Sequence, residues 1–264
     1  MITLGEIFRQ FIATGRIHDP RSSKHHLVYH DSAILCGSPL KKIKTVLVGI
    51  DIGVGELLLV DRLSKKKKID LVISHHPHGT AQTNYPKAMG MQTEILKKCG
   101  LKNKYAERLM GVEIEKSICK TYSANYETVI DAARLLNIPF MCVHTPADNL
   151  AWSYLSQYLK HCVTLGDIES ALLKLPEYKH AAFMGVPPLI FRGQSKDLVN
   201  KLWIDMTGGN PIPSTALSQL CKQGITTIVG MHLPESTAKS LKKVPINFVL
   251  AGHLASDNLG MNLL

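Results

Sequence analysis

Two adjacent histidines, His75 and His76, follow an apolar run in the segment Ser-His-His-Pro. Neutral imidazole is a common ligand for divalent transition metals. Adjacent side chains point to opposite sides of a straight strand, but at a strand end the chain turns, so both rings could face one cleft and serve two neighbouring metals. Pro77 would stiffen that turn. The alternative interpretation is a polar loop whose histidines bind nothing.

Two further segments place a histidine and an aspartate four residues apart. His253 and Asp257 follow an apolar run near the C-terminus. A helix that starts there would bring both side chains to one face, although Asp257 could instead simply complement the helix dipole. His144 and Asp148 follow another short apolar run. Asp148 could bridge two metals, because a carboxylate offers two oxygens.

Together the three motifs predict a pair of divalent metal ions with nitrogen and oxygen ligands. The ligand types suit Zn, Mn, Fe or Ni. His144 could be a ligand or an ordinary loop histidine, but we favour a role in holding a ligand in place. The predicted ligands are His75, His76, Asp148, His253 and Asp257.

To bring these ligands together, each motif must follow directly after the end of a strand. Residues 45–74 predict a strand, a helix and a second strand, which leads into His75, and the crossover is long enough for parallel pairing. Residues 226–250 predict the same order and lead into His253. Open α/β sheets bind ligands at the carboxyl ends of their strands. We therefore expect an α/β fold with two similar lobes, His75 and His253 at matching strand ends, and a dinuclear metal site in the cleft between the lobes.

The remaining segments complete the two lobes. Helical periodicity between residues 87 and 137 predicts a helical insertion, and a short strand follows at residues 140–143. Strands are also predicted within residues 181–191, interrupted by two prolines. We expect one integrated domain whose lobes are residues 1–150, insertion included, and residues 151–264.

Three other features could contribute to a site. His232 and Glu235 stand where the first strand of the second lobe ends, so they could face the metals or act as general acid or base. Glu235 is equally suited to the first turn of a helix. The segment 207–211, Thr-Gly-Gly-Asn-Pro, is either a loop over the cleft that contacts phosphate through backbone N–H groups or a plain turn. The glycine-rich segment after Asp51 is a poor dinucleotide-binding motif, because Leu58 replaces its third glycine.

Composition narrows the class of protein. A formal charge of +10 could attract nucleic acid or phosphorylated small molecules, or could reflect a lysine-rich solvated surface. The 45% hydrophobic content excludes a wholly disordered chain. No apolar run reaches the roughly 18 residues that cross a bilayer, and no signal-peptide pattern opens the chain, so we expect a cytoplasmic protein without a membrane partner. Six scattered cysteines without a Cys-x-x-Cys pair indicate reduced thiols.

The order of these motifs resembles the NGG-one-interacting-factor-three family, also catalogued as GTP cyclohydrolase 1 type 2 homologues. The resemblance covers most of the chain and depends on a strand with Asp51, Ser-His-His-Pro, His-Thr-x-x-Asp, and Gly-His-x-x-x-acid. It implies two metal ions between two related α/β lobes, and a ring-shaped homohexamer. The residues that would bind the metals are His75, His76, Asp148, His253 and Asp257.

Three departures from the family pattern indicate a divergent branch. Asp257 stands where the family usually has glutamate, so its helix must lie closer to the metals or a water must intervene. Asp148 follows His76 by 72 positions, a long interval that implies an inserted helical segment near residues 106–126. His78 follows the histidine pair and could line the site.

The leading hypothesis for function is a metal-dependent hydrolase. Two metals about 3.5–4 Å apart would activate a shared water near neutral pH. The ligand set and the basic charge favour a nucleotide-like or phosphorylated small molecule as substrate, and we do not adopt the cyclohydrolase activity in the family name. The alternative is a metal-stabilised, ring-shaped scaffold or regulatory protein that binds protein or nucleic-acid partners; steeply salt-dependent binding to DNA would favour the nucleic-acid version.

Overall fold

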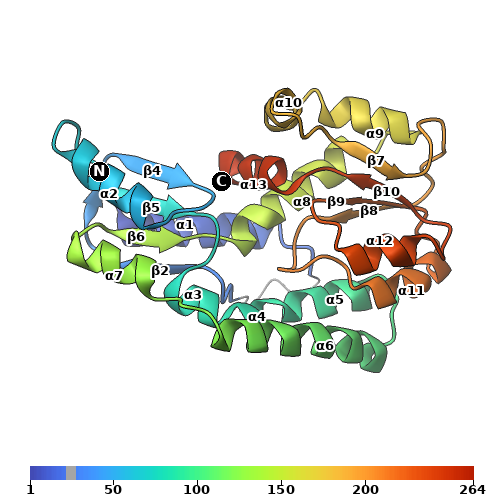
Figure 1. Cartoon of the computed structure of the whole chain (residues 1–264), viewed down its shortest axis with the longest axis horizontal. Helices are drawn as coiled ribbons and strands as arrows, with labels where there is room; N and C mark the ends of the chain where they lie inside the picture. The colour runs from blue at the N-terminus through green and yellow to red at the C-terminus, as the bar shows by residue number, and fades with distance from the viewer. Residues whose placement is uncertain (22–27) are drawn as a thin grey trace.

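The computed structural model describes residues 1–21 and 28–264 and contains two four-stranded sheets, carried by different halves of the chain (Figure 1). The first sheet has the order β2-β6-β5-β4, with β2 (Ala33–Cys36), β6 (Phe140–Cys142), β5 (Leu71–Ser74) and β4 (Val46–Gly49). The second has the order β7-β10-β9-β8, with β7 (Leu189–Arg192), β10 (Asn247–Leu250), β9 (Thr227–Gly230) and β8 (Leu202–Asp205). The short strands β1 (Ile2–Thr3) and β3 (Lys42–Ile43) pair separately.

The two sheets share one topology. Each has three parallel strands and one antiparallel edge strand, which is β2 beside β6 in the first sheet and β7 beside β10 in the second. By this order β5 corresponds to β9, and β6 corresponds to β10. The predicted match between His75 and His253 is therefore wrong by one strand. The prediction lacks β8, whose three apolar residues stand between Lys201 and Asp205 and show no longer apolar run.

The first sheet is covered on both faces. Helices α2 (Val54–Ser64) and α7 (Thr128–Leu135) pack on one face, and α1 (Leu4–Ile17) packs on the other. Val72 belongs to the core on the α2 side, whereas its neighbours Leu71 and Ile73 belong to the core on the α1 side. This double burial explains the continuous apolar sequence of β5.

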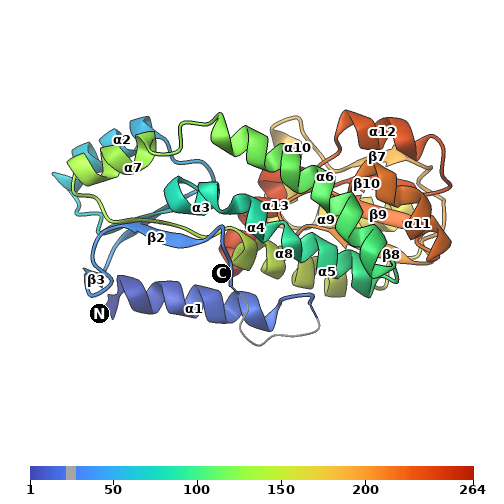
Figure 2. The same cartoon turned by 90° about the horizontal axis from the view of Figure 1, so that it is seen from below.

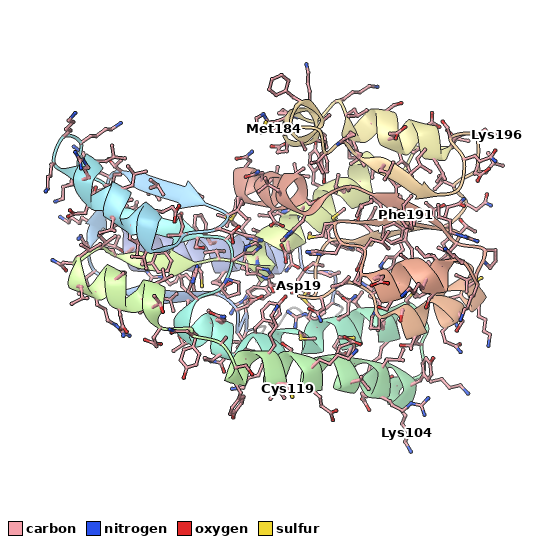
Figure 3. All side chains as sticks on the ribbon, viewed as in Figure 1. Asp19, Lys104, Cys119, Met184, Phe191 and Lys196 are labelled. Carbon is pink, nitrogen blue, oxygen red and sulfur yellow. The ribbon has the colours of Figure 1, made fainter. Side chains whose placement is uncertain are left out.

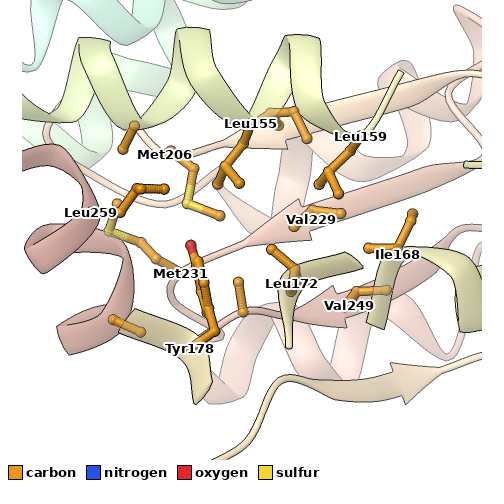
Figure 4. Close-up of a cluster of buried hydrophobic side chains, with 14 of the residues drawn as sticks. Leu155, Leu159, Ile168, Leu172, Tyr178, Met206, Val229, Met231, Val249 and Leu259 are labelled. Carbon is orange, nitrogen blue, oxygen red and sulfur yellow. The ribbon is translucent and has the colours of Figure 1, made fainter. Parts of the chain in front are cut away.

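The second sheet is also covered on both faces. On one side lie α8 (Thr145–Tyr158), α9 (Leu165–Leu172), α10 (Pro176–Phe183) and α13 (His253–Leu263). Their core includes Leu155, Tyr178 and Val229 (Figure 4). On the other side lie η1 (Ser214–Ala216), α11 (Leu217–Lys222) and α12 (Glu235–Leu241).

The predicted helical insertion joins the two lobes. It contains α3 (Gly79–Thr83), α4 (Tyr85–Ala88), α5 (Gly90–Lys98) and α6 (Asn103–Tyr122) before α7. Apolar side chains of α5 and α6 enter the core of the second sheet, although both helices precede β6 of the first. Figure 2, the view from below, shows α6 in front of the second lobe, with one end near α3.

One segment differs from the predicted secondary structure. The strands predicted within residues 181–191 are wrong in their first part, because Pro176 begins helix α10, which extends to Phe183. Only Leu189–Arg192 forms a strand there. In the described part of the chain, no helix combines the length and the apolar character that crossing a membrane requires.

Candidate metal centre

The histidine pair lies where β5 ends. The N–H groups of His75 and His76 donate to the carbonyls of Gly49 and Ile50, at 2.9 and 3.1 Å, which extends the pairing with β4 by two residues. The Ser74 hydroxyl donates to the His76 carbonyl at 3.0 Å and stabilises the turn that follows. The two imidazole rings consequently lie with centroids 5.2 Å apart, as the strand-end argument anticipates.

Two helices present the aspartates. His144 is the N-cap of α8, which follows β6, and His253 is the first residue of α13, which follows β10. Each is followed four residues later by an aspartate on the same helix face. His253 Nε2 lies 2.9 Å from Asp257 Oδ2, and His144 Nδ1 lies 3.5 Å from Asp148 Oδ2. Both His-x-x-x-Asp segments thus lie at corresponding places in the two lobes.

All five predicted ligands meet in one cluster, together with His144. His75 Nε2 lies 3.5 Å from Asp148 Oδ1 and 3.6 Å from Asp257 Oδ1. His76 Nε2 lies 3.3 Å from Asp257 Oδ2 and 3.2 Å from His253 Nε2. Three sets of side chains each have ligand atoms within 4.8 Å of one another: His75, His76 and His144; His76, His253 and Asp257; and His75, Asp148 and Asp257.

Hydrogen bonds fix three of the imidazole rings through Nδ1. Nδ1 of His75 lies 3.1 Å from the Val143 carbonyl, and Nδ1 of His76 lies 2.6 Å from Asp51 Oδ1. Nδ1 of His144 lies 2.9 Å from Asp31 Oδ2. Because a carbonyl or carboxylate can only accept, we assign the proton to Nδ1, which leaves the Nε2 lone pair free for a metal.

The cluster contains polar atoms that a cation would satisfy. His75 Nε2 and both carboxylate oxygens of Asp257 are buried and make no aligned hydrogen bond within the described residues, although imidazole nitrogens lie 2.9–3.6 Å from the Asp257 oxygens. Each such atom costs about 1–3 kcal/mol if it stays unpaired. Burial opposes ionisation of Asp257, yet the surrounding imidazoles of His253, His75 and His76 hold the pKa of its carboxyl far below the usual range. An ionised carboxylate facing imidazole nitrogens fits a divalent cation.

The shorter side chain of Asp257 is accommodated by close packing of its helix. A Cβ atom at Gly260, one turn after Asp257, would lie 2.5 Å from the Ala147 carbonyl oxygen of α8. Only glycine allows α13 to approach α8 this closely. This contact holds α13, and with it Asp257, against the helix that carries Asp148.

The cluster opens into a cavity of about 540 Å³. Thr207, Gly209, Asn210 and Pro211 line it, so the 207–211 segment lies beside the cluster of histidines and aspartates. The Tyr85 hydroxyl donates to the Gly209 carbonyl and links this loop to α4.

Of the other predicted site residues, one lines the cavity and two do not. His232 lines the cavity with its ring centroid 4.3 Å from that of His253, and burial together with that neighbour lowers the pKa of His232 to about 4. Glu235 is exposed in the first turn of α12 and pairs with Lys239 instead of facing the cluster. His78 packs against Phe140 at a centroid distance of 5.6 Å and does not line the cavity.

Two carboxylates of this region are not among the residues predicted from the sequence. Asp31 is fully buried and contacts both His144 and the Thr145 hydroxyl, the latter at 2.6 Å. Asp205 ends β8, lines the cavity and accepts the Ile212 N–H at 3.0 Å, while burial raises its pKa to about 7. Neither belongs to a recognisable motif, because their partners are distant in the sequence or not polar side chains.

Comparison with solved structures relates the fold of this chain to a protein of the NIF3 superfamily. Neither the scan of protein-family models nor the search of curated proteins finds a match. Among solved structures, the chain is similar to a NIF3 superfamily protein from Sphaerobacter thermophilus, with a TM-score of 0.79 and 25% identity over 96% of this chain and 91% of that one.

More distant structures share the fold. Reduced HcgD from Methanocaldococcus jannaschii has a TM-score of 0.58 at 12% identity, covering 99% of this chain and 91% of its own. A Bacillus cereus protein related to NIF3 has a TM-score of 0.52 at 12% identity, covering 97% and 90%. The chain thus has the fold of the NIF3 superfamily protein from Sphaerobacter thermophilus, and this likeness agrees with the motifs that resemble the family.

Proposed function

We propose that this protein binds two divalent metal ions and hydrolyses a nucleotide-like or phosphorylated small molecule. The observation that carries the proposal is the arrangement of three imidazoles, each held through Nδ1. Nε2 of His75 faces Asp148 and Asp257, and Nε2 of His76 faces Asp257. Rings fixed in this way are typical of metal centres, because the outer hydrogen bond sets both tautomer and orientation.

Asp257 is the ligand best placed to be shared. Its Oδ1 faces His75, and its Oδ2 faces His76 and His253. One metal position would then have His76, His253 and Asp257 as ligands. The other would have His75, Asp148 and Asp257, with His144 beside them. This assignment gives Asp257 the bridging role that the sequence suggested for Asp148.

The donor set favours transition metals over calcium or magnesium. Imidazole nitrogens outnumber carboxylates in the cluster, whereas calcium and magnesium sites are built mainly from oxygen. Bound metals of this kind supply Lewis acidity and activate water near neutral pH.

The chain itself supplies the surroundings for the reaction. His232 lines the cavity beside His253 but belongs to none of the ligand-spaced sets, so we assign it to contact with the substrate. The loop of residues 207–211 borders the same space and would limit the access of bulk water to a bound substrate.

Metal content and turnover test the function together. Protein purified without a His-tag should contain about two transition-metal ions per chain, measured by inductively coupled plasma mass spectrometry. A panel of phosphomonoesters, phosphodiesters and nucleotides, assayed with Mn²⁺ or Zn²⁺, should reveal turnover that chelation removes and metal restores. His75→Ala with His76→Ala should lose both properties, whereas exposed His161→Ala should keep both. Turnover by metal-free protein would refute the proposal.

We also propose that the chain assembles with copies of itself, as a hexamer. Exposed apolar side chains gather on α10 and the edge strand β7: Phe183, Met184, Val186, Leu189 and Phe191. Met184 and Phe191 lie at the periphery of the second lobe (Figure 3). An exposed apolar edge strand is an aggregation hazard that a subunit contact would remove.

Light scattering after size-exclusion chromatography should therefore give about six times the chain mass of 29.2 kDa. Phe191→Glu should reduce that mass, because it places a charge in the apolar contact. Leu135→Glu, at a more exposed apolar position on α7, is the control and should leave it unchanged. A monomeric wild-type protein would contradict the proposal.

A further inference from the structure

The second half of α6 turns a polar stripe toward the metal cavity. In the first half of this helix, Ala106 and Met110 are buried in the core of the second sheet. Beyond Met110, Ile114 still packs against that core, but the residues that line the cavity follow helical spacing along another face: Glu113, Lys116, Ser117, Lys120, Thr121 and Ala124. The cavity-facing residues are thus largely polar, where an apolar face would serve if the helix only covered a core.

The stripe carries donors suited to an anion. Lys116 and Lys120 are four residues apart, so both ammonium groups can reach one ligand, and the hydroxyls of Ser117 and Thr121 lie on the same face. Lys116 pairs with Glu113 at 2.9 Å. No carboxylate among the described residues pairs with Lys120. One positive charge on this wall therefore has no protein partner.

On the opposite wall of the cavity, the carboxylates have positive or cation-binding partners of their own. Asp148 and Asp257 face imidazoles and, under the proposed function, metal ions. They therefore do not need the lysines of α6 as counter-charges. The free positive charge faces space that a ligand would occupy, and a phosphoryl group offers the several acceptor oxygens that two ammonium groups and two hydroxyls can bind.

We propose that the stripe on α6 binds a phosphoryl group of the substrate that is distinct from the bond acted on at the metals. This rests on the proposed function, in which the reacting bond lies at the cluster on the other side of the cavity. The substrate would then be a compact molecule with a phosphoryl group at one end and the reacting group at the other. The predicted hydrolase would recognise it through Lys116 and Lys120.

Inorganic phosphate is the first probe. Calorimetric titration at constant ionic strength should detect phosphate binding to protein stripped of metal. Lys120→Ala should weaken that binding about threefold, and the double variant with Lys116→Ala about tenfold, because each contact is partly exposed to solvent. Lys120→Arg should retain most of it. Glu113→Gln should tighten it, because it frees Lys116 from its ion pair.

Matched controls separate this site from the metals. Lys104→Ala removes an exposed lysine from the first turn of the same helix, pointing away from the cavity (Figure 3), and should change nothing. Metal content should remain at the wild-type level in every variant. Lysine-dependent phosphate binding by a protein that takes up no metal, even when Zn²⁺ or Mn²⁺ is supplied, would refute the proposed function alone. No phosphate binding, equal binding by the lysine variants, or equally tight binding of acetate would refute the phosphoryl site.

Discussion

Asp257→Asn is expected to remove metal from both positions of the cluster. Asparagine has nearly the same shape as aspartate, but it has no negative charge and only one oxygen to donate. Asp257 faces His75 with one oxygen and His76 and His253 with the other, so both proposed positions lose a ligand at once. We expect metal affinity to fall by at least about 100-fold, more than the loss of an outer hydrogen-bond partner costs.

The measurement is metal content after dialysis, followed by calorimetric titration with Zn²⁺ and Mn²⁺. Glu235→Gln is the matched control, because it neutralises an exposed acid of the same lobe that pairs only with Lys239 on the surface. Retention of two ions by Asp257→Asn would contradict the assignment of this cluster as the metal centre. Retention of one ion would show that Asp257 serves a single position and that Asp148 is the shared ligand.

The members of this cluster could be picked out from the sequence because they follow buried strands. Leu71–Ser74 is buried throughout, so its aliphatic run is continuous and its end is marked by the histidine pair. Asn247–Leu250 gives a similar signal before His253. The partners that orient the rings gave no such signal. Asp31 contacts His144 across 113 positions of sequence, a contact that only the antiparallel pairing of β2 with β6 creates.

The residues that correspond between the two lobes can be found only from the complete strand order of both sheets. Ser74 pairs with Gly49 in the first sheet, and Gly230 pairs with Asp205 in the second, so the residues after them correspond. His75 then corresponds to Met231, and His76 corresponds to His232. The second lobe thus has a buried thioether where the first has an imidazole ligand. His232 therefore lies beside the cluster without a strand-end histidine as its neighbour, at the place where we propose that it contacts the substrate.

Gly260→Ala is expected to weaken folding and metal binding together. The new methyl group would lie 2.5 Å from the Ala147 carbonyl oxygen, and the neighbouring atom is backbone, so α13 must move away from α8. Overpacking of this kind costs about 1–3 kcal/mol of folding free energy, partly offset by the better helix propensity of alanine. The same shift withdraws His253 and Asp257 from His75 and His76, and we expect metal affinity to fall more than about tenfold.

A second substitution distinguishes loss of position from general damage. Asp257→Glu lengthens the ligand by one methylene, so adding it to Gly260→Ala should restore part of the metal affinity while the folding free energy stays low. Gly55→Ala is the control, because a methyl group on this glycine of α2 meets no atom within 4 Å and should stabilise the helix slightly. Urea unfolding and Zn²⁺ titration measure the two effects. Wild-type affinity in Gly260→Ala, or no gain in the double variant, would show that close packing of α13 does not set the reach of Asp257.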